Sequence, residues 1–344
     1  MKNPAKVLGR CWVGKESQCT VNGWSAKMAC STAACCHRHP RACAASVVMD
    51  VPPAHPHVTY LAFEGRDASV ADEVGLSAYS VQRMAPGTAV TVLTDSWRMA
   101  DQLSMRVPKH VKVTIIDHRT TASYFRRVGL VKMAHHSGLG GYSKLIVDKL
   151  LPSDLNATIV LDSDTLLVDD ILPVWRLRER FFRQGALLMA KRITSGGACL
   201  KGQRINSGVL LLDLERMRRT NWTDVLLERI AWLGRGNVPA RLCGKMVRNR
   251  STLAAGDQEL LSYGCLQAGK GTCAALPHGM HQDKCDGIEG GSRAVILHFN
   301  CRGSVPGDCP LSGPCRALVH DFQASGMALQ TATSMRSKWR SHHL

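Results

Sequence analysis

Two aspartates that directly follow a buried apolar run constrain this chain more than any other feature. The run, residues 157–161, reads Ala-Thr-Ile-Val-Leu, and it is followed by Asp162, Ser163 and Asp164. An apolar run of this length predicts a buried strand. On an extended segment residues i and i+2 point to the same side, so the two carboxylates can share one hard metal ion. They would lie at the carboxyl end of the strand, where open α/β sheets bind ligands. The alternative is that Asp162 only caps the turn after the strand.

Alternating strand and helix patterns surround this acidic pair and predict the fold class. Apolar runs at 58–62, 89–93 and 111–116 are separated by stretches of helical periodicity. We therefore expect an α/β fold, Rossmann-like, with a mostly parallel central sheet flanked by helices. The later elements that we expect are helices at 142–151, from 170, at 215–233 and at 257–263, and strands at 157–161, 185–190, 209–214 and 294–297.

Composition divides the chain into three parts. Residues 1–56 are rich in Cys, Ala, Arg and His without apolar periodicity, so we expect an irregular arm. Residues 57–316 hold the α/β domain, and residues 317–344 are a basic tail rich in Ser, Arg and His. No run of about 18 uncharged apolar residues is present, which predicts no transmembrane span. The first 50 residues also lack the apolar core of a signal peptide.

The 14 cysteines lie towards the two ends of the chain, and none falls between residues 50 and 198. This distribution is typical of disulfides in a protein of the secretory pathway. Asn-X-Ser/Thr triplets at Asn156, Asn221 and Asn249 permit a lumenal location. The competing interpretation is zinc bound within residues 30–43, where cysteines and histidines cluster, but their spacing matches no familiar structural zinc site.

The formal net charge of +17 raises the possibility of a nucleic-acid partner. Lys and Arg are, however, spread along the chain, without a basic helix interleaved with aromatics. We therefore expect no nucleic-acid partner, and rank such a protein behind the other candidates. A nucleotide diphosphate, an anionic glycan or a membrane surface would suit the same charge. The charge is therefore also compatible with association with a membrane.

Several motifs occur in a fixed order along the chain. They are the segment from Ser137 to Leu145 (Ser-Gly-Leu-Gly-Gly-Tyr-Ser-Lys-Leu), the Asp162-Ser-Asp164 pair, Ile205-Asn-Ser-Gly-Val-Leu-Leu-Leu-Asp-Leu214, Gly256-Asp-Gln258, and His298-Phe-Asn-Cys-Arg302. In this order they resemble glycosyltransferase family 8, the retaining GT-A transferases that include glycogenin. They are most similar to the xylosyltransferase domain of LARGE-type glycan synthases and to glucoside xylosyltransferases.

The resemblance implies a GT-A-type domain that transfers a sugar from a UDP-sugar, with xylose favoured, to a glycan or glycoprotein with retention of configuration. It implies that Asp162, Asp164 and His298 bind a divalent ion. An imidazole ligand favours Mn²⁺ over Mg²⁺, although Mg²⁺ remains an alternative. Lys144 and Arg302 would neutralise the leaving diphosphate. Members of this type act in the Golgi, so the resemblance also implies a Golgi lumenal location.

Further roles follow for the remaining motif residues. Ser163 belongs to the donor-binding set, and Asn206 and Ser207 would hydrogen-bond sugar hydroxyls, with Gly208 allowing close backbone approach. The alternative for this motif is a turn that only leads into a strand.

Asp257 and Gln258 would contact the donor sugar near the reacting carbon. The alternative for Asp257 is helix capping. Asp257 is also the carboxylate to consider as a nucleophile, but front-side attack is favoured because no second acid is evident. His298 and Lys144 in isolation would be read as an ordinary buried histidine and a helix-face lysine.

The chain departs from the family pattern at two places. The stretch Leu276-Pro-His-Gly-Met-His281-Gln282 stands where the family has an aromatic-Asn-X-Gln sequence, which bears on donor or acceptor preference. Arg302 stands where the family usually has Lys. These departures leave a second hypothesis, a catalytically silent lumenal protein that binds a nucleotide sugar or a glycan. The complete set of acidic, imidazole and amide residues argues for the enzyme.

Overall fold

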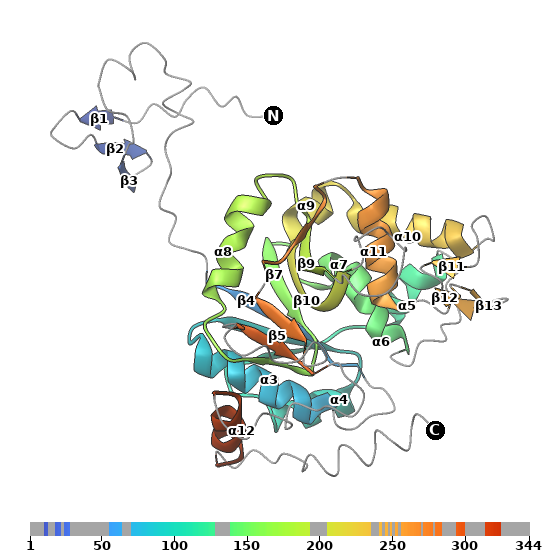
Figure 1. Ribbon diagram of the computed structural model, residues 1–344, viewed down its shortest axis with the longest axis horizontal. Helices are drawn as coiled ribbons and strands as arrows, with labels where there is room; N and C mark the ends of the chain where they lie inside the picture. The colour runs from blue at the N-terminus through green and yellow to red at the C-terminus, as the bar shows by residue number, and fades with distance from the viewer. Residues whose placement is uncertain are drawn as a thin grey trace. The chain divides into compact units, whose positions relative to one another are not determined.

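The structure is a computed structural model. It describes residues 55–63, 70–127, 138–192, 205–234, 256–269, 271–277, 279–283, 294–299 and 314–324, together with short strands at 10–12, 18–21, 24–27, 241–242, 245–246, 248–249 and 252–253 (Figure 1). The chain divides into two compact units, Met1–His55 and Pro56–Leu344. Within the described residues no helix is long and apolar enough to cross a membrane.

The amino-terminal unit contains a three-stranded antiparallel sheet where the sequence predicted an irregular arm. Its strands are β1 (Arg10–Trp12), β2 (Gln18–Val21) and β3 (Trp24–Lys27). Val21 pairs with Trp24, so only Asn22 and Gly23 connect β2 to β3. Asn-Gly between two short strands is the strongest local signal for a hairpin. No strand was predicted here, because the prediction relied on apolar periodicity, which strands of three or four residues barely display.

A seven-stranded sheet forms the centre of the second unit and confirms the predicted α/β fold with a mostly parallel sheet. The strand order is β15-β9-β10-β7-β4-β5-β6. Only the pairings of β10 are antiparallel, so the other six strands share one direction. The strands are β4 (His57–Leu61), β5 (Ala89–Thr94), β6 (Lys112–Ile115), β7 (Ala157–Leu161), β9 (Leu188–Arg192), β10 (Ile205–Asp213) and β15 (Cys273–Ala275).

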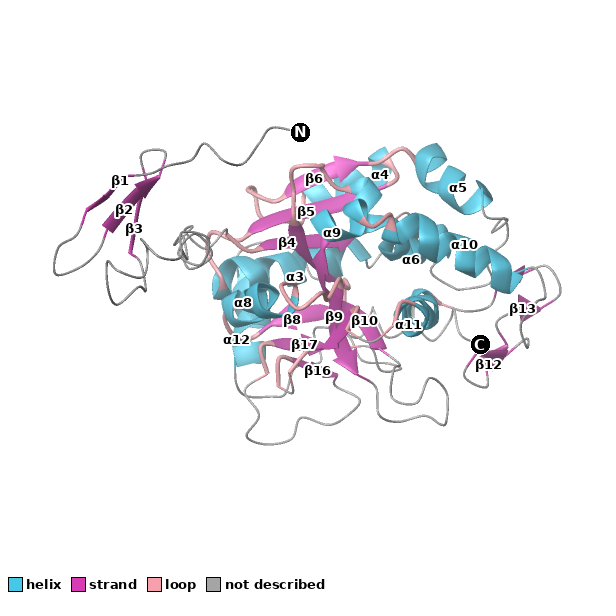
Figure 2. Ribbon diagram, turned by 90° about the horizontal axis from the view of Figure 1, so that it is seen from above, coloured by secondary structure: helices cyan, strands magenta, loops and turns pink. Residues whose placement is uncertain are grey.

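Helices cover both faces of this sheet, because the central strands are apolar on both sides (Figure 2). In β7, Ile159 and Leu161 face one layer and Val160 faces the other. The first layer contains α3 (Val70–Met84), α4 (Trp97–Ser104) and α8 (Leu172–Phe181). The second contains α5 (His118–Arg127), α6 (Gly138–Tyr142), the 3-10 helix η2 (Ser143–Ile146), α7 (Val147–Leu150), α9 (Leu214–Arg219), α10 (Trp222–Gly234) and α11 (Asp257–Gln267).

Two of the predicted helices are divided in the structure. The helix expected at 142–151 is built from the end of α6, η2 and α7. The helix expected at 215–233 breaks at Asn221, which has a positive φ of 50°, between α9 and α10. Asn tolerates this left-handed conformation better than most residues. Arg218, near the end of α9, donates to five backbone carbonyls between residues 148 and 155, the segment that leads into β7.

A small second sheet, in the order β16-β17-β8, lies beside the acidic pair. Its strands are β16 (His281–Asp283), β17 (Ile296–His298) and β8 (Thr165–Leu167). It packs with α3 and with α12 (Pro314–Ala324), a helix that runs across the predicted boundary at residue 316. Of the predicted disulfides, the bond between Cys265 and Cys273 lies within the described residues and ties α11 to β15. The described part also includes four two-residue strands, β11 (Arg241–Leu242), β12 (Lys245–Met246), β13 (Arg248–Asn249) and β14 (Thr252–Leu253).

His57 gives the second unit a pH-dependent stability. Its ring lies at the amino end of β4 and hydrogen-bonds the hydroxyls of Thr158 and Thr91, at 2.9 and 3.1 Å. Burial, helped by the charge of Lys112, lowers the pKa of His57 to about 4. The folded protein therefore keeps the ring neutral, whereas the unfolded chain takes up a proton below pH 6.5. The contribution of neutral His57 to the free energy of unfolding should be fully present above pH 6.5. It should be lost as the pH drops towards 4, by up to about 3 kcal/mol.

Urea unfolding between pH 4.5 and 7.5 measures this effect against the variant His57→Gln, which cannot titrate. We expect the variant to lose less stability than the wild type over this interval. Parallel curves for the two proteins would show that other groups cause the pH dependence.

Candidate functional site

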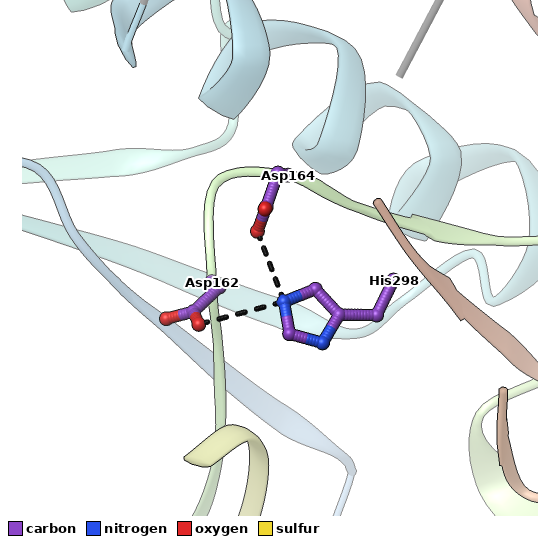
Figure 3. Close-up of side chains that lie close together, drawn as sticks. All are labelled: Asp162, Asp164 and His298. Atoms are coloured by element: carbon purple, nitrogen blue, oxygen red, sulfur yellow. Dashed lines mark ion pairs between the residues drawn. The ribbon is translucent and has the colours of Figure 1, made fainter. Parts of the chain in front are cut away.

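The register of the small sheet brings His298 to the acidic pair. Thr165 follows Asp164 directly and pairs with His298 in the antiparallel ladder of β8 and β17. The backbone N–H of Phe299 donates to the carbonyl of Asp164 at 2.9 Å. The three side chains consequently converge, and Figure 3 shows both carboxylates facing the same ring nitrogen. His298 is distant from the two aspartates in the sequence, and the pairing of β17 with β8 brings it to them.

The geometry of the three side chains fits one divalent cation. The Nε2 of His298 lies 3.2 Å from Oδ1 of Asp164 and 3.6 Å from Oδ2 of Asp162. Ligand atoms about 2.1 Å from a cation lie about 3 Å apart at neighbouring octahedral positions. Two carboxylate oxygens and an imidazole nitrogen suit Mn²⁺ or another divalent metal. The predicted metal-ligand set is therefore compatible with the structure.

The two aspartates do not lie on the extended segment that the sequence predicted. We expected an extended segment to point both side chains the same way, but the strand ends at Leu161, and Ser163 and Asp164 form a turn. This turn is stabilised because the hydroxyl of Thr165 donates to the carbonyl of Asp162 at 2.8 Å. The carboxylates therefore converge through a turn that the neighbouring strand β8 supports.

The charges around the acidic pair are tightly coupled. Burial raises the pKa of Asp162 and the nearby Asp164 raises it further, although Lys144 opposes both effects. Burial acts in the same direction on Asp164, but His298 outweighs it and lowers the pKa of Asp164. Two carboxylates in this arrangement repel each other, and a bound cation would relieve the repulsion.

Lys144 lies between two carboxylates. Its ammonium contacts Oδ1 of Asp162, lies 3.1 Å from Oδ2 of Asp257, and donates to the carbonyl of Ser207 at 3.2 Å. Burial alone would lower the pKa of Lys144, but the two carboxylates outweigh it and raise the pKa. Lys144 thus joins the acidic pair to Asp257. The sequence placed Lys144 near the diphosphate but did not anticipate this ion pairing.

The antiparallel direction of β10 brings Asn206, Ser207 and Gly208 to the same edge. Because β10 runs against β7, its amino end meets the carboxyl end of β7, and the backbone N–H of Asp162 donates to the carbonyl of Gly208 at 2.9 Å. Asn206 and Ser207 lie inside β10, where the sequence predicted that they precede the strand. Ser207 donates to Oδ2 of Asp257 at 2.8 Å. Asn206 is buried, and its Oδ1 accepts from the backbone N–H of Gly208 at 2.8 Å.

Asp257 is not the cap of α11. The N-cap is Gly256, whose N–H donates to Oε2 of Glu259 at 3.1 Å, while Asp257 points to Lys144 and Ser207. Glu259 stands at the third helical position, a spacing that favours this contact. Gln258 is the next residue on α11 and is half-buried. The capping alternative for Asp257 is therefore wrong.

Helix α3 supports the acidic turn through a chain of hydroxyls. Ser77 Oγ lies 2.8 Å from the Tyr60 hydroxyl and 3.2 Å from Thr165 Oγ1. Ser163, predicted to bind the donor, donates to Oε2 of Glu73 at 2.7 Å. Glu73 was not predicted as a site residue, because nothing in the spacing of a helix residue relates it to a turn ninety residues later.

Some predicted positions fall outside the described residues. They are Arg302, His278 and the clustered cysteines and histidines of residues 30–43. The role of Arg302 at a diphosphate therefore stays a prediction. His281, in contrast, lies within the described residues, and its ring contacts the ring of His298.

Comparison with known proteins supports the fold and the resemblance. No family model matches the chain. The xylosyl- and glucuronyltransferase LARGE1 of Danio rerio is 34% identical over 105 residues, which are 28% of this chain and 14% of that protein. LARGE2 of Homo sapiens is 32% identical over 106 residues, 28% of this chain and 15% of that protein. The match thus spans about a seventh of the length of these relatives.

Two solved structures share the architecture. Mouse xyloside xylosyltransferase 1 superposes with a TM-score of 0.54 at 18% identity, over 72% of this chain and 99% of that one. The galactosyltransferase LgtC, solved with donor and acceptor sugar analogues, has a TM-score of 0.54 at 15% identity, over 81% of this chain and 99% of that one. The α/β fold of this chain is therefore that of GT-A glycosyltransferases, and its resemblance to glycosyltransferase family 8 is confirmed.

Proposed function

We propose that this chain is a retaining, metal-dependent glycosyltransferase that moves a sugar, with xylose favoured, from a UDP-sugar to a hydroxyl of a glycan or glycoprotein. The observation that carries the proposal is the convergence of Asp162, Asp164 and His298 beside the cluster of Lys144, Ser207 and Asp257. This convergence lies at the ligand-binding edge of a GT-A sheet. The matched glycosyltransferases support a sugar-transferring enzyme rather than a silent binding protein.

The charge balance of the site explains why a cation is required. Among the described residues of this cluster, the three carboxylates of Asp162, Asp164 and Asp257 are balanced by one ammonium, that of Lys144, which leaves two negative charges in excess when His298 is neutral. Such a cluster would repel a nucleotide diphosphate. One divalent ion restores neutrality, so we propose that metal binds before or together with the donor. Mn²⁺ is favoured by the imidazole ligand, and when bound it supplies Lewis-acid stabilisation of the departing UDP.

The protein side chains then position the sugar and its leaving group. Lys144 places a positive charge beside the acidic pair, where negative charge develops on the diphosphate as the sugar departs. We propose that Asn206, Ser207 and Gln258 bind sugar hydroxyls. Both Lys144 and Ser207 donate to the same oxygen of Asp257, which reduces the nucleophilicity of that carboxylate. We therefore favour front-side attack by the acceptor over a covalent glycosyl-enzyme.

A lumenal site of action in the secretory pathway, the Golgi included, is part of the proposal. The disulfide between Cys265 and Cys273 supports it, because such bonds persist in oxidising compartments.

The test is UDP release with Mn²⁺ from UDP-xylose, UDP-glucose, UDP-galactose, UDP-glucuronate and UDP-N-acetylglucosamine, each with and without an added glycan acceptor. We expect release from one donor above all, with xylose first. Release that persists in the presence of excess EDTA would contradict the metal assignment. A folded protein that binds UDP but releases none under any condition would favour the silent binding protein.

A further inference from the structure

His281 contacts the one ring nitrogen of His298 that faces away from the aspartates. Nε2 of His281 lies 3.3 Å from Nδ1 of His298, and the ring centroids are 5.3 Å apart with the planes tilted by 41°. Both rings are buried, with 5% and 3% of their surface exposed. His298 is thus contacted by carboxylates at Nε2 and by an imidazole at Nδ1.

The strand register accounts for this contact. β16 and β17 are parallel, with His281 paired to Ile296 and Asp283 paired to His298. Residues two apart on a strand share a face, so His281 and His298 are diagonal neighbours on one face of the small sheet. A buried imidazole at this position reaches the second nitrogen of its neighbour directly.

The tautomer of His298 depends on the hydrogen-bond partner of its Nδ1. A histidine binds a metal through a nitrogen that carries no proton, and the other nitrogen then carries the N–H. Metal on Nε2 would place this proton on Nδ1 of His298, 3.3 Å from His281. His281 Nε2 can accept it in the tautomer that carries its own proton on Nδ1.

We infer that His281 is a positioning residue, which accepts the Nδ1 proton of His298 and so holds Nε2 of His298 towards the metal. This inference rests on the proposed function, because it assumes that His298 is a metal ligand. It also gives a role to the departure from the family pattern at residues 276–282. His281, one residue of this departure, lies against the proposed metal ligand, where it would act on metal affinity.

Two variants of similar length separate a hydrogen-bonding role from simple packing. His281→Leu fills the space but accepts no proton, whereas His281→Gln offers an amide oxygen near the position of the lost nitrogen. Gln282→Leu makes a comparable change on the opposite face of β16 and serves as the control. The dissociation constant of Mn²⁺ is measured by calorimetry in the full chain, with and without UDP, and the melting temperature of each variant is recorded.

We expect His281→Leu to raise the Mn²⁺ dissociation constant about 10- to 100-fold, in the range found for residues that orient metal ligands. His281→Gln should restore most of the affinity, and Gln282→Leu should leave it unchanged. Equal affinity in wild type and His281→Leu would overturn the inference and leave the proposed function standing. Equally weak Mn²⁺ binding by His281→Leu and His281→Gln would reduce His281 to a packing role and would also overturn the inference. Failure of both His281→Leu and His281→Phe to fold would do the same.

The proposed function fails separately. A wild-type protein that binds no Mn²⁺, with or without UDP, would remove the metal site itself. The Mn²⁺ dissociation constants of His281→Leu and His281→Gln can be compared only if the wild type binds metal. Failure of the proposed function is therefore distinguishable from failure of the inference about His281.

Discussion

Asp164→Asn is expected to abolish metal-dependent transfer while leaving the fold intact. The carboxylate of Asp164 lies 3.2 Å from Nε2 of His298, and its side chain is 28% exposed. An amide in its place removes one of the negative charges that attract the cation. Loss of a residue that merely orients a metal ligand costs about 10- to 100-fold, so loss of a ligand should cost more than about 100-fold in Mn²⁺ affinity and in UDP release.

The fold should survive because the structural contact of residue 164 is made by its backbone. The carbonyl of Asp164 accepts from Phe299 at 2.9 Å, and the substitution leaves that carbonyl in place. Asp169→Asn is the matched control, because it neutralises an exposed aspartate a few residues along the same segment. Full turnover by Asp164→Asn, with Mn²⁺ dependence retained, would show that the metal lies elsewhere.

Gly208→Ala is expected to have an effect of similar size through one added methyl group. A Cβ built at residue 208 would lie 2.1 Å from Cε1 of His298 and 2.6 Å from each of its ring nitrogens. Real Cβ atoms essentially never approach other heavy atoms within 3.0 Å. The ring cannot retreat easily, since it is buried and contacts Asp164 and His281 on its two sides.

Either His298 leaves the acidic pair or β10 moves away from β7, so metal affinity should fall more than about 100-fold, as for loss of the ligand itself. Overpacking of this kind costs about 1–3 kcal/mol, which a domain with two layers of core can absorb. Val209→Ile adds a methylene at the next position, on the other face of β10, and controls for overpacking alone.

A double variant makes the mechanism testable. If Gly208→Ala acts only by displacing His298, adding it to His298→Ala should cost little further Mn²⁺ affinity, because both changes remove the same interaction. Additive losses would mean that Gly208 serves the site in another way, such as approach to the sugar, which was the role predicted from sequence.

The sequence motifs predicted the site at the level of individual residues. Asp162, Asp164 and His298 were all predicted as metal ligands, and the structure brings them together. Lys144, Ser207 and Asp257 were also predicted as site residues, but their mutual contacts were not predicted, because no spacing in the chain relates residue 144 to residue 257. Where the local pattern was weak, as in the short strands β8 and β16 and the hairpin of β2 and β3, no strand was predicted.

By itself the sequence determined the order of the main strands and helices of the α/β domain, the apolar faces of β7 and β10, and the chemical identity of the groups at the ligand-binding edge. These follow from local periodicity and side-chain chemistry, which a linear chain displays directly. Only the tertiary structure decided that β10 runs against its neighbours, that His298 pairs beside Thr165, and that Gly208 and His281 enclose the His298 ring. Those features depend on strand register and on contacts between distant segments, because hydrogen-bonded ladders and close packing form only once the chain has folded.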